Sequence, residues 1–248
     1  MNGMSWSQRF ELFFSYLKEP VWQQRLLSGL WVTVRIAVLG LLIGIVIGTL
    51  IAAVKVAPKY KRLLRVLEKV CDVYVAIFRG TPMVVQLLIG YYVLLPLLGI
   101  RTQAVNVGVA VFGLNSGAYV SEIMRGGLRS VDEGQMEAGR ALGMGYPITM
   151  LKIIVPQAVK NIVPTLGNEF ITLIKETSVL SFIAISDMYT IFQKIVSNSY
   201  EPIVPYLSMA LVYILLVLIV TWLIRLTEKL LARSDRTRTA GKKAKEAA

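Results

Sequence analysis

A short run of polar and charged side chains within an otherwise apolar stretch, about residues 162–185, is where this sequence could do chemistry. Glu169 and Glu176 are seven residues apart, or two helical turns, so both carboxylates lie on one face of a helix. Ionised groups in apolar helices are costly and mark functional sites by default. The acids could bind an ammonium or guanidinium group, or one of them could form a structural ion pair with Lys175. The candidate site comprises Asn168, Glu169, Lys175, Glu176, Thr177 and Ser178.

The residue types that the chain lacks exclude most other chemistry. There is no histidine, which excludes Ser-His and Cys-His nucleophile pairs and histidine-ligated metals. The single cysteine, Cys71, can form no intrachain disulfide, and we expect an inert thiol. No GxxxxGK[ST] phosphate-binding loop occurs. We therefore expect no catalytic residue, no metal site and no cofactor in this chain.

The elements that position the acids are predicted to be membrane helices. Of the 248 residues, 55% are hydrophobic and only 17% are charged, against roughly 25% charged in a typical globular chain. A transmembrane helix needs roughly 20 apolar residues. Four charge-free stretches meet this requirement, and 162–185 is the fifth candidate. The other four are 36–54, 80–100, 102–121 and 202–224. These patterns predict an all-α membrane protein with five transmembrane helices.

Two terminal segments flank the predicted spans. Residues 1–28 place aromatic residues at amphipathic spacing among charged ones and lack the apolar core of a secretory signal. We expect this segment to form an interfacial helix on the lipid bilayer. The transmembrane domain then covers 29–228, and residues 229–248 form a basic tail.

The basic residues predict the orientation of the chain. Segments 55–72, 125–160 and the tail from Arg225 carry nineteen of the 27 Lys and Arg residues. Five spans place these three segments on one side of the membrane, and positively charged loops stay in the cytoplasm. We therefore expect the N-terminus outside and the C-terminus inside. The net charge of +12 is a topology signal and does not indicate a nucleic-acid partner.

Small and polar residues within the spans predict close packing and a helix break. A ladder of Gly40, Gly44 and Gly48 leaves one helix face nearly bare, which favours the close approach of a neighbouring helix. Gly80, Thr81 and Pro82 interrupt the helical pattern at the start of the second span, and broken helices tend to line cavities. An ordinary interfacial helix start is the alternative. Two further polar residues inside spans, Gln86 and Asn115, are weak candidates for the substrate path, since interhelical hydrogen bonding also explains them.

The longest segment between spans, about residues 128–160, is predicted to be ordered. Its pattern indicates two short helices around a glycine turn, with Ser130 as the N-cap of the first. Gly143 and Gly145 end that first helix, and Pro156 stops or kinks the second. A short ordered helix outside the membrane suggests a docking site for another protein.

The string EAGRALGMGYPITMLKIIVPQA in this segment resembles the EAA loop of the membrane subunits of ATP-binding-cassette (ABC) importers. Glu137, Ala138, Gly143 and Pro156 match the loop, and Gly139 replaces its second alanine. Further strings resemble the polar amino-acid permease subfamily of these importers, namely FRGTPMVVQL at 78–87, SGAYVSEIMRGGLRSVDEGQMEAGRALG at 116–143 and LIKETSVLSFI at 173–183. The resemblance covers about residues 28 to 226.

This resemblance implies the type I ABC importer permease fold and a set of partners. It implies two cytoplasmic ATPase subunits that bind ATP-Mg, a second permease subunit that is identical or similar, and an extracellular or periplasmic solute-binding protein. Residues 130–145 would be the coupling helix that docks onto an ATPase. The location implied is the bacterial cytoplasmic (inner) membrane, and the substrate implied is a polar amino acid. The coupling residues so assigned are Glu137, Ala138, Gly139, Leu142, Gly143, Gly145 and Pro156.

Two other classes of function compete with an importer subunit. A stand-alone secondary transporter or channel for small polar solutes would predict internal repeats, and none is convincing here. A membrane enzyme would need a catalytic constellation, which the sequence does not offer. Co-purification with a cytoplasmic ATPase separates the importer subunit from both.

Overall fold

The computed structural model describes residues 4–58, 60 and 62–246, with side chains described as far as Lys229, and all regular structure among them is helical. The elements in chain order are α1 (Trp6–Lys18), α2 (Pro20–Val56), α3 (Arg62–Gly80), α4 (Met83–Leu88), the π-helix η1 (Ile89–Leu94), α5 (Leu95–Leu97), α6 (Ala104–Arg129), α7 (Gly134–Ala141), α8 (Tyr146–Thr149), the π-helix η2 (Met150–Ile154), α9 (Val155–Glu176), the 3₁₀ helix η3 (Thr177–Ile183), α10 (Met188–Ser199) and α11 (Ile203–Glu246).

Within the described residues, three helices are long and apolar enough to cross a membrane, and the number rises to five if each of two bent helix pairs is one span. The three helices are α2, α6 and the Ile203–Lys229 part of α11. The first pair bends by 107° between Gly80 and Met83, and the second bends by 54° between Ile183 and Met188. The helix break predicted at Gly80, Thr81 and Pro82 lies at the first of these bends. Gly80 ends α3, and residues 83–97 continue in a different direction.

The N-terminal segment also differs from the expectation. We expected one interfacial segment over 1–28, but a break falls at Glu19, where α1 ends and Pro20 begins α2. Proline suits this first helical position, because its missing N–H group would have no partner there. α2 is then one continuous helix through residue 28, so the expected domain boundary between residues 28 and 29 lies inside it.

The core of the molecule is the contact between α2 and α6. A Cβ atom at Gly40 would lie 2.9 Å from the Cβ of Phe112, and one at Gly48 would lie 2.6 Å from Cγ1 of Val120. Real Cβ atoms essentially never come that close, so these positions require glycine for the observed spacing. The glycine ladder on α2 therefore faces α6 and brings the two backbones together.

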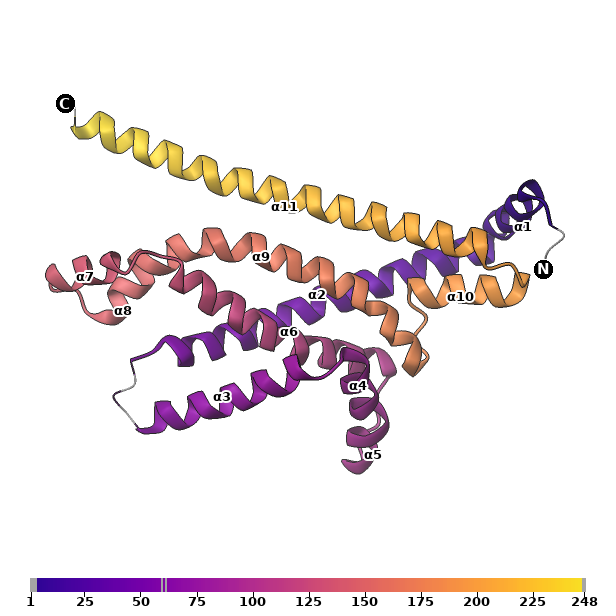
Figure 1. Ribbon diagram of the computed structural model, residues 1–248, viewed down its shortest axis with the longest axis horizontal. Coiled ribbons are helices and arrows are strands. Elements are labelled where there is room, and N and C mark those ends of the chain that lie inside the picture. Colours follow the sequence, from indigo (N-terminus) through magenta and orange to yellow (C-terminus); the bar gives the residue numbers. More distant parts are fainter. Residues whose placement is uncertain (1–3, 59, 61, 247–248) are drawn as a thin grey trace.

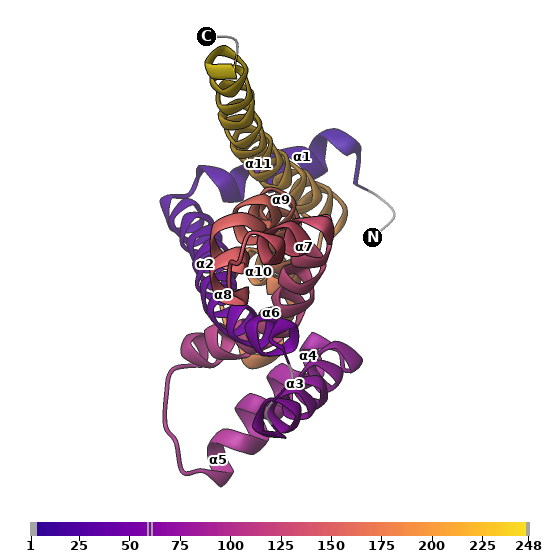
Figure 2. The same cartoon turned by 90° about the vertical axis from the view of Figure 1, so that its left-hand side faces the viewer.

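The elements segregate to two ends of an elongated molecule (Figure 1). One end holds α7, α8, the end of α2, the start of α3 and the C-terminal end of α11, whereas α1 and α10 lie at the opposite end. Figures 1 and 2 both place α3, α4 and α5 on the side of the molecule away from α11. The three basic segments of the sequence thus lie toward the same end.

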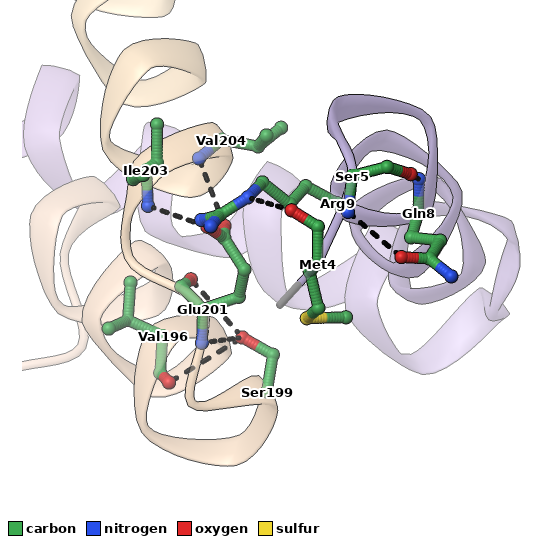
Figure 3. Close-up of polar contacts among 9 residues, drawn as sticks. All are labelled: Met4, Ser5, Gln8, Arg9, Val196, Ser199, Glu201, Ile203 and Val204. Carbon is green, nitrogen blue, oxygen red and sulfur yellow. Dashed lines mark hydrogen bonds and ion pairs between the residues drawn. The ribbon is translucent and has the colours of Figure 1, made fainter. Parts of the chain in front are cut away.

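At the opposite end, a buried ion pair attaches α1 to the start of α11 (Figure 3). Nη1 of Arg9 lies 2.6 Å from Oε1 of Glu201, whose side chain is only 4% exposed. The same carboxylate accepts hydrogen bonds from the backbone N–H groups of Ile203 and Val204, at 3.2 and 3.0 Å. Phe13 and Trp22 are buried beside this site, in a cluster with α10 residues. α1 is therefore a docked part of the fold.

Candidate functional site

A cavity of about 360 Å³ lies where the helix break, α6 and α9 meet. The break contributes Thr81 and Pro82 to its wall, and α9 contributes Glu169 and Glu176. α6 contributes Asn115 and Tyr119. The two acids, as their spacing predicted, face the same space, which we call the upper cavity.

The two carboxylates have no cationic partner among the described side chains. Glu169 accepts a hydrogen bond of 3.1 Å from the hydroxyl of Ser116, which orients it without neutralising a charge. An acid in an apolar surrounding is stabilised in its ionised form only if a cation or enough donors compensate its charge. Such compensation is not supplied to either carboxylate by a cationic side chain among the described residues.

Glu122 on α6 provides a contrast within the same chain. Its Oε1 lies 2.9 Å from Nζ of Lys55, and its Oε2 accepts a 3.0 Å hydrogen bond from Nε of Arg125. Lys55 in turn lies 2.9 Å from Oδ1 of Asp72. This four-residue charge network joins α2, α3 and α6, and it compensates the charge of Glu122 internally. Sequence reasoning noted none of these pairs; Glu122 and Arg125 are three residues apart on one helix face, whereas Lys55 and Glu122 are 67 residues apart and meet only in the fold.

Hydrogen bonds from Gln86 and Asn115 hold the helix break in place. The side-chain amide of Gln86 donates to the carbonyls of Phe78 and Thr81, at 2.8 and 3.0 Å. Asn115 donates to Oε1 of Gln86, at 2.9 Å. Carbonyls at a helix end need such partners away from water. Of the two weak substrate-path candidates, Asn115 also lines the upper cavity, whereas Gln86 lies behind it.

The remaining candidates from the sequence lie outside the upper cavity. Lys175 and Ser178 line a separate, largely apolar groove against α11. Thr177 is fully buried and donates to the carbonyl of Ile174, at 2.7 Å. Asn168 is exposed and does not line the cavity. Since each residue turns a helix by about 100°, positions 168 and 175 point away from the face shared by 169 and 176.

Two polar cavity residues were missed from the sequence, Tyr119 and Thr172. A signal for both was present in the spacing. Tyr119 lies four residues after Asn115 on α6, and Thr172 lies three after Glu169 on α9, so each shares a face with a candidate. Neither is ionisable at neutral pH, and a search for charged groups therefore passed over them.

The segment 128–160 forms a hairpin between the short helix α7 and α8; the expected second short helix is instead the start of a longer run, since α8 continues through η2 into α9. α7 ends in a Schellman motif, in which Met144 N–H donates to Gly139 O and Gly143 N–H donates to Arg140 O, both at 2.9 Å. Gly143 has a φ of +73°, the left-handed region that favours glycine. Leu142 at the tip is 79% exposed. The hairpin thus presents an apolar side chain beyond the membrane helices.

Tight packing fixes the hairpin on the rest of the molecule. A Cβ atom at Gly139 would lie 2.5 Å from Cγ2 of Thr149, so the glycine in place of the second alanine lets α7 approach α8. The hydroxyl of Tyr146 donates to the carbonyl of Val56 at the end of α2, at 2.9 Å. Glu137 and Ala138 are exposed on α7, Gly145 precedes α8, and Pro156 lies in the first turn of α9.

One helix boundary in this region was predicted wrongly. We expected Ser130 to be the N-cap of the first hairpin helix, but it is the C-cap residue of α6, and its hydroxyl donates to the carbonyl of Gly127. α7 begins four residues later, at Gly134, whose N–H donates a 2.7 Å hydrogen bond to Oδ1 of Asp132. Within the described residues, no group of three or more Cys, Asp or Glu side chains could hold a metal ion.

An all-helical chain with candidate membrane spans, a broken span and a cavity beside the break is typical of membrane transport proteins. The family model of the binding-protein-dependent transport system inner membrane component matches residues 40–233. The chain belongs to this family. It is accordingly a transport subunit of a multi-pass inner membrane system and not an enzyme.

Similar proteins agree with this assignment along most of the chain. A putative glutamine transport system permease protein of Rickettsia bellii is 39% identical over 204 residues, covering 82% of this chain and 91% of that protein. An arginine transport system permease protein of Bacillus subtilis is 37% identical, covering 85% and 94%. A solved amino acid ABC transporter with histidines has a TM-score of 0.77 and 36% identity, covering 86% and 97%.

Proposed function

We propose that this chain carries an amino acid across the membrane and holds its cationic group against Glu169 and Glu176. The single observation that supports this role is the pair of carboxylates that line one cavity and have no cationic partner among the described residues. Every amino acid carries an α-ammonium group at neutral pH, and a charge-assisted hydrogen bond to a carboxylate binds such a group well. The printed functions of the similar permeases, glutamine and arginine transport, are consistent with this substrate class.

The energy for uptake comes from a separate ATPase in this proposal. Two cytoplasmic ATPase subunits bind ATP-Mg and contact the α7–α8 hairpin of each of two permease subunits. Glu137 and the exposed Leu142 are the side chains best placed to contact them. A solute-binding protein delivers the amino acid from outside.

The orientation in this proposal places the N-terminus outside and the hairpin inside. Its support is the common location of the basic segments toward one end, the end that holds α7 and α8 (Figure 1). Because positive loops remain cytoplasmic, that end faces the ATPases and the cytoplasm.

The test is uptake of labelled glutamine, arginine and histidine by the complete complex in proteoliposomes. We expect Glu176→Ala and Glu169→Gln each to raise KM about tenfold or more, because each removes a charge-assisted bond of about 1.5–3 kcal/mol. Assembly with the ATPase should remain intact. Glu11→Gln, which changes an exposed acid on α1, is the matched control. Unchanged uptake kinetics in both cavity variants would refute the assignment.

A further inference from the structure

A second cavity, of about 420 Å³, lies next to the upper cavity on the side of the hairpin. We call it the lower cavity. Its wall includes Glu122 and Gly126 of α6, and Asn161 and Thr165 of α9. Tyr119 lines both cavities. Among the described residues, no other side chain is common to the two walls.

The spacing of the wall residues shows that the two cavities lie along one track. On α9, residues 161, 165, 169, 172 and 176 follow at intervals of three or four, which places them on one helix face. On α6, residues 115, 119, 122, 126 and 130 do the same. α6 runs toward the hairpin and α9 runs away from it (Figure 1). The two cavities and their polar walls therefore lie along one track on α6 and α9, which we call the passage.

Side chains from α3 and α6 meet where the cavities adjoin. The ring of Tyr119 projects from α6, and the guanidinium carbon of Arg79 lies 5.3 Å from the centre of that ring. Arg79 is in the last turn of α3, immediately before the 107° bend. It also lines the lower cavity. The stacked pair therefore occupies the passage between the acids of the upper cavity and the space near the hairpin.

We propose that Tyr119 and Arg79 form a gate between the upper and lower cavities. The proposal rests on the function proposed above, since it makes the gate the barrier that an amino acid passes after it leaves Glu169 and Glu176. A change in the bend after Gly80 would move Arg79 off the ring, and Tyr119 could then turn aside. A cation–π contact is worth about 0.5–2 kcal/mol, so the gate is closed by a small energy that a conformational change can overcome.

The charges around the passage fit this role. Glu122 of the lower cavity is already paired with Lys55 and Arg125. A cationic substrate that has passed the gate therefore meets a wall whose acid is compensated, and it is not held there. Among the acids described in the two cavity walls, the two without a cationic partner, Glu169 and Glu176, line the upper cavity, which favours binding on that side of the gate and release on the other.

The experiment measures access to the upper cavity from the cytoplasmic side. Cys71, the single native cysteine, is replaced by serine, and a cysteine is introduced at Thr172 in the upper cavity. The complete complex with its ATPase is labelled with a membrane-impermeant, charged maleimide in inside-out vesicles. The labelling rate is measured in two conditions, without nucleotide and with ATP plus vanadate. The variants are then compared in the condition in which the parent complex is labelled more slowly.

We expect Tyr119→Ala to raise the labelling rate at position 172 about tenfold, because loss of the ring removes a contact of about 1.4 kcal/mol or more. Tyr119→Phe keeps the ring and should label like the parent. Arg79→Gln removes the cation and should raise the rate less than Tyr119→Ala does. A cysteine at Thr165, below the gate, should label equally in all backgrounds.

Equal labelling at position 172 in Tyr119→Ala and the parent would overturn the gate. If Tyr119→Ala lowers the melting temperature of the complex, the test rests on Arg79→Gln alone. A labelling rate at position 172 that is the same in Arg79→Gln and the parent then overturns the proposal. The assay uses no amino acid, so it fails or succeeds independently of the proposed substrate. A complex that transports no amino acid could still show the gate, and a transporting complex could lack it.

Discussion

Gly44 and Glu169 are connected through one side chain, that of Ser116. The Ser116 hydroxyl donates to Oε1 of Glu169 at 3.1 Å, and a Cβ atom at Gly44 would lie 2.5 Å from that same hydroxyl oxygen. The bare surface of α2 therefore leaves room for the side chain that orients a cavity acid. At the scale of single residues, the close packing of α2 against α6 therefore also determines where a cavity acid is held.

Substituting this glycine should cost both stability and transport. We expect Gly44→Ala to destabilise the permease by about 1–3 kcal/mol, the typical cost of overpacking a tight contact, and to impair uptake by displacing Ser116. Gly126→Ala on α6 is the matched control, since a Cβ atom there meets nothing within 4 Å. Alanine is the better helix former, so this control should melt at the same or a higher temperature. Thermal unfolding of the purified complexes measures the stability of both variants. Equal melting temperatures for the two variants would contradict the packing account.

At the scale of elements, the conformation of the hairpin α7–α8 depends on two glycines. Its turn depends on the left-handed Gly143 and its width on Gly139. We expect the double substitution Glu137→Arg, Gly143→Asp to abolish ATP-driven uptake, because it reverses a charge and strains the turn at the proposed ATPase contact. The melting temperature of the isolated permease should change little.

Capture of the ATPase by immobilised permease measures this prediction. Arg101→Glu, which reverses a charge outside the hairpin in the exposed segment between α5 and α6, should leave capture unchanged. Full ATPase binding and uptake by the double variant would show that another element makes the contact.

Periodicity and composition were sufficient to predict elements of this kind, but not their directions. The paired acids, the glycine ladder and the glycine turn could all be read from spacing along one helix. The 107° bend after Gly80 could not, because it depends on carbonyl partners supplied by Gln86 and Asn115 from other turns and another helix. A helical wheel would have predicted that Lys175 lies on a different side of the helix from Glu169 and Glu176. The ion pairs of Lys55 required the tertiary fold, since Glu122 is 67 residues away.

At the scale of the whole molecule, the end opposite the hairpin is closed by the contact between α1 and the start of α11. We expect Glu201→Ala to loosen α1, because it breaks a buried ion pair, a change that typically costs about 3–5 kcal/mol, and removes the cap of α11. Hydrogen exchange of the backbone amides in residues 6–18 should be faster in this variant. Glu19→Ala is the control, since Glu19 is exposed and its side chain makes no cap hydrogen bond. Identical exchange in the two variants would show that α1 is held by its aromatic contacts alone.

The same contact sets an order of events during synthesis. Arg9 and Glu201 are 192 residues apart, so α1 emerges from the ribosome long before its partner exists. Through most of translation, Phe13 has no α10 to pack against, and the amphipathic α1 must wait at the bilayer surface. Only a chain that has inserted all of its earlier helices can bring residue 201 to it. The docking of α1 is thus a late step of folding, and a chain that ends before residue 201 would leave the aromatic helix α1 undocked.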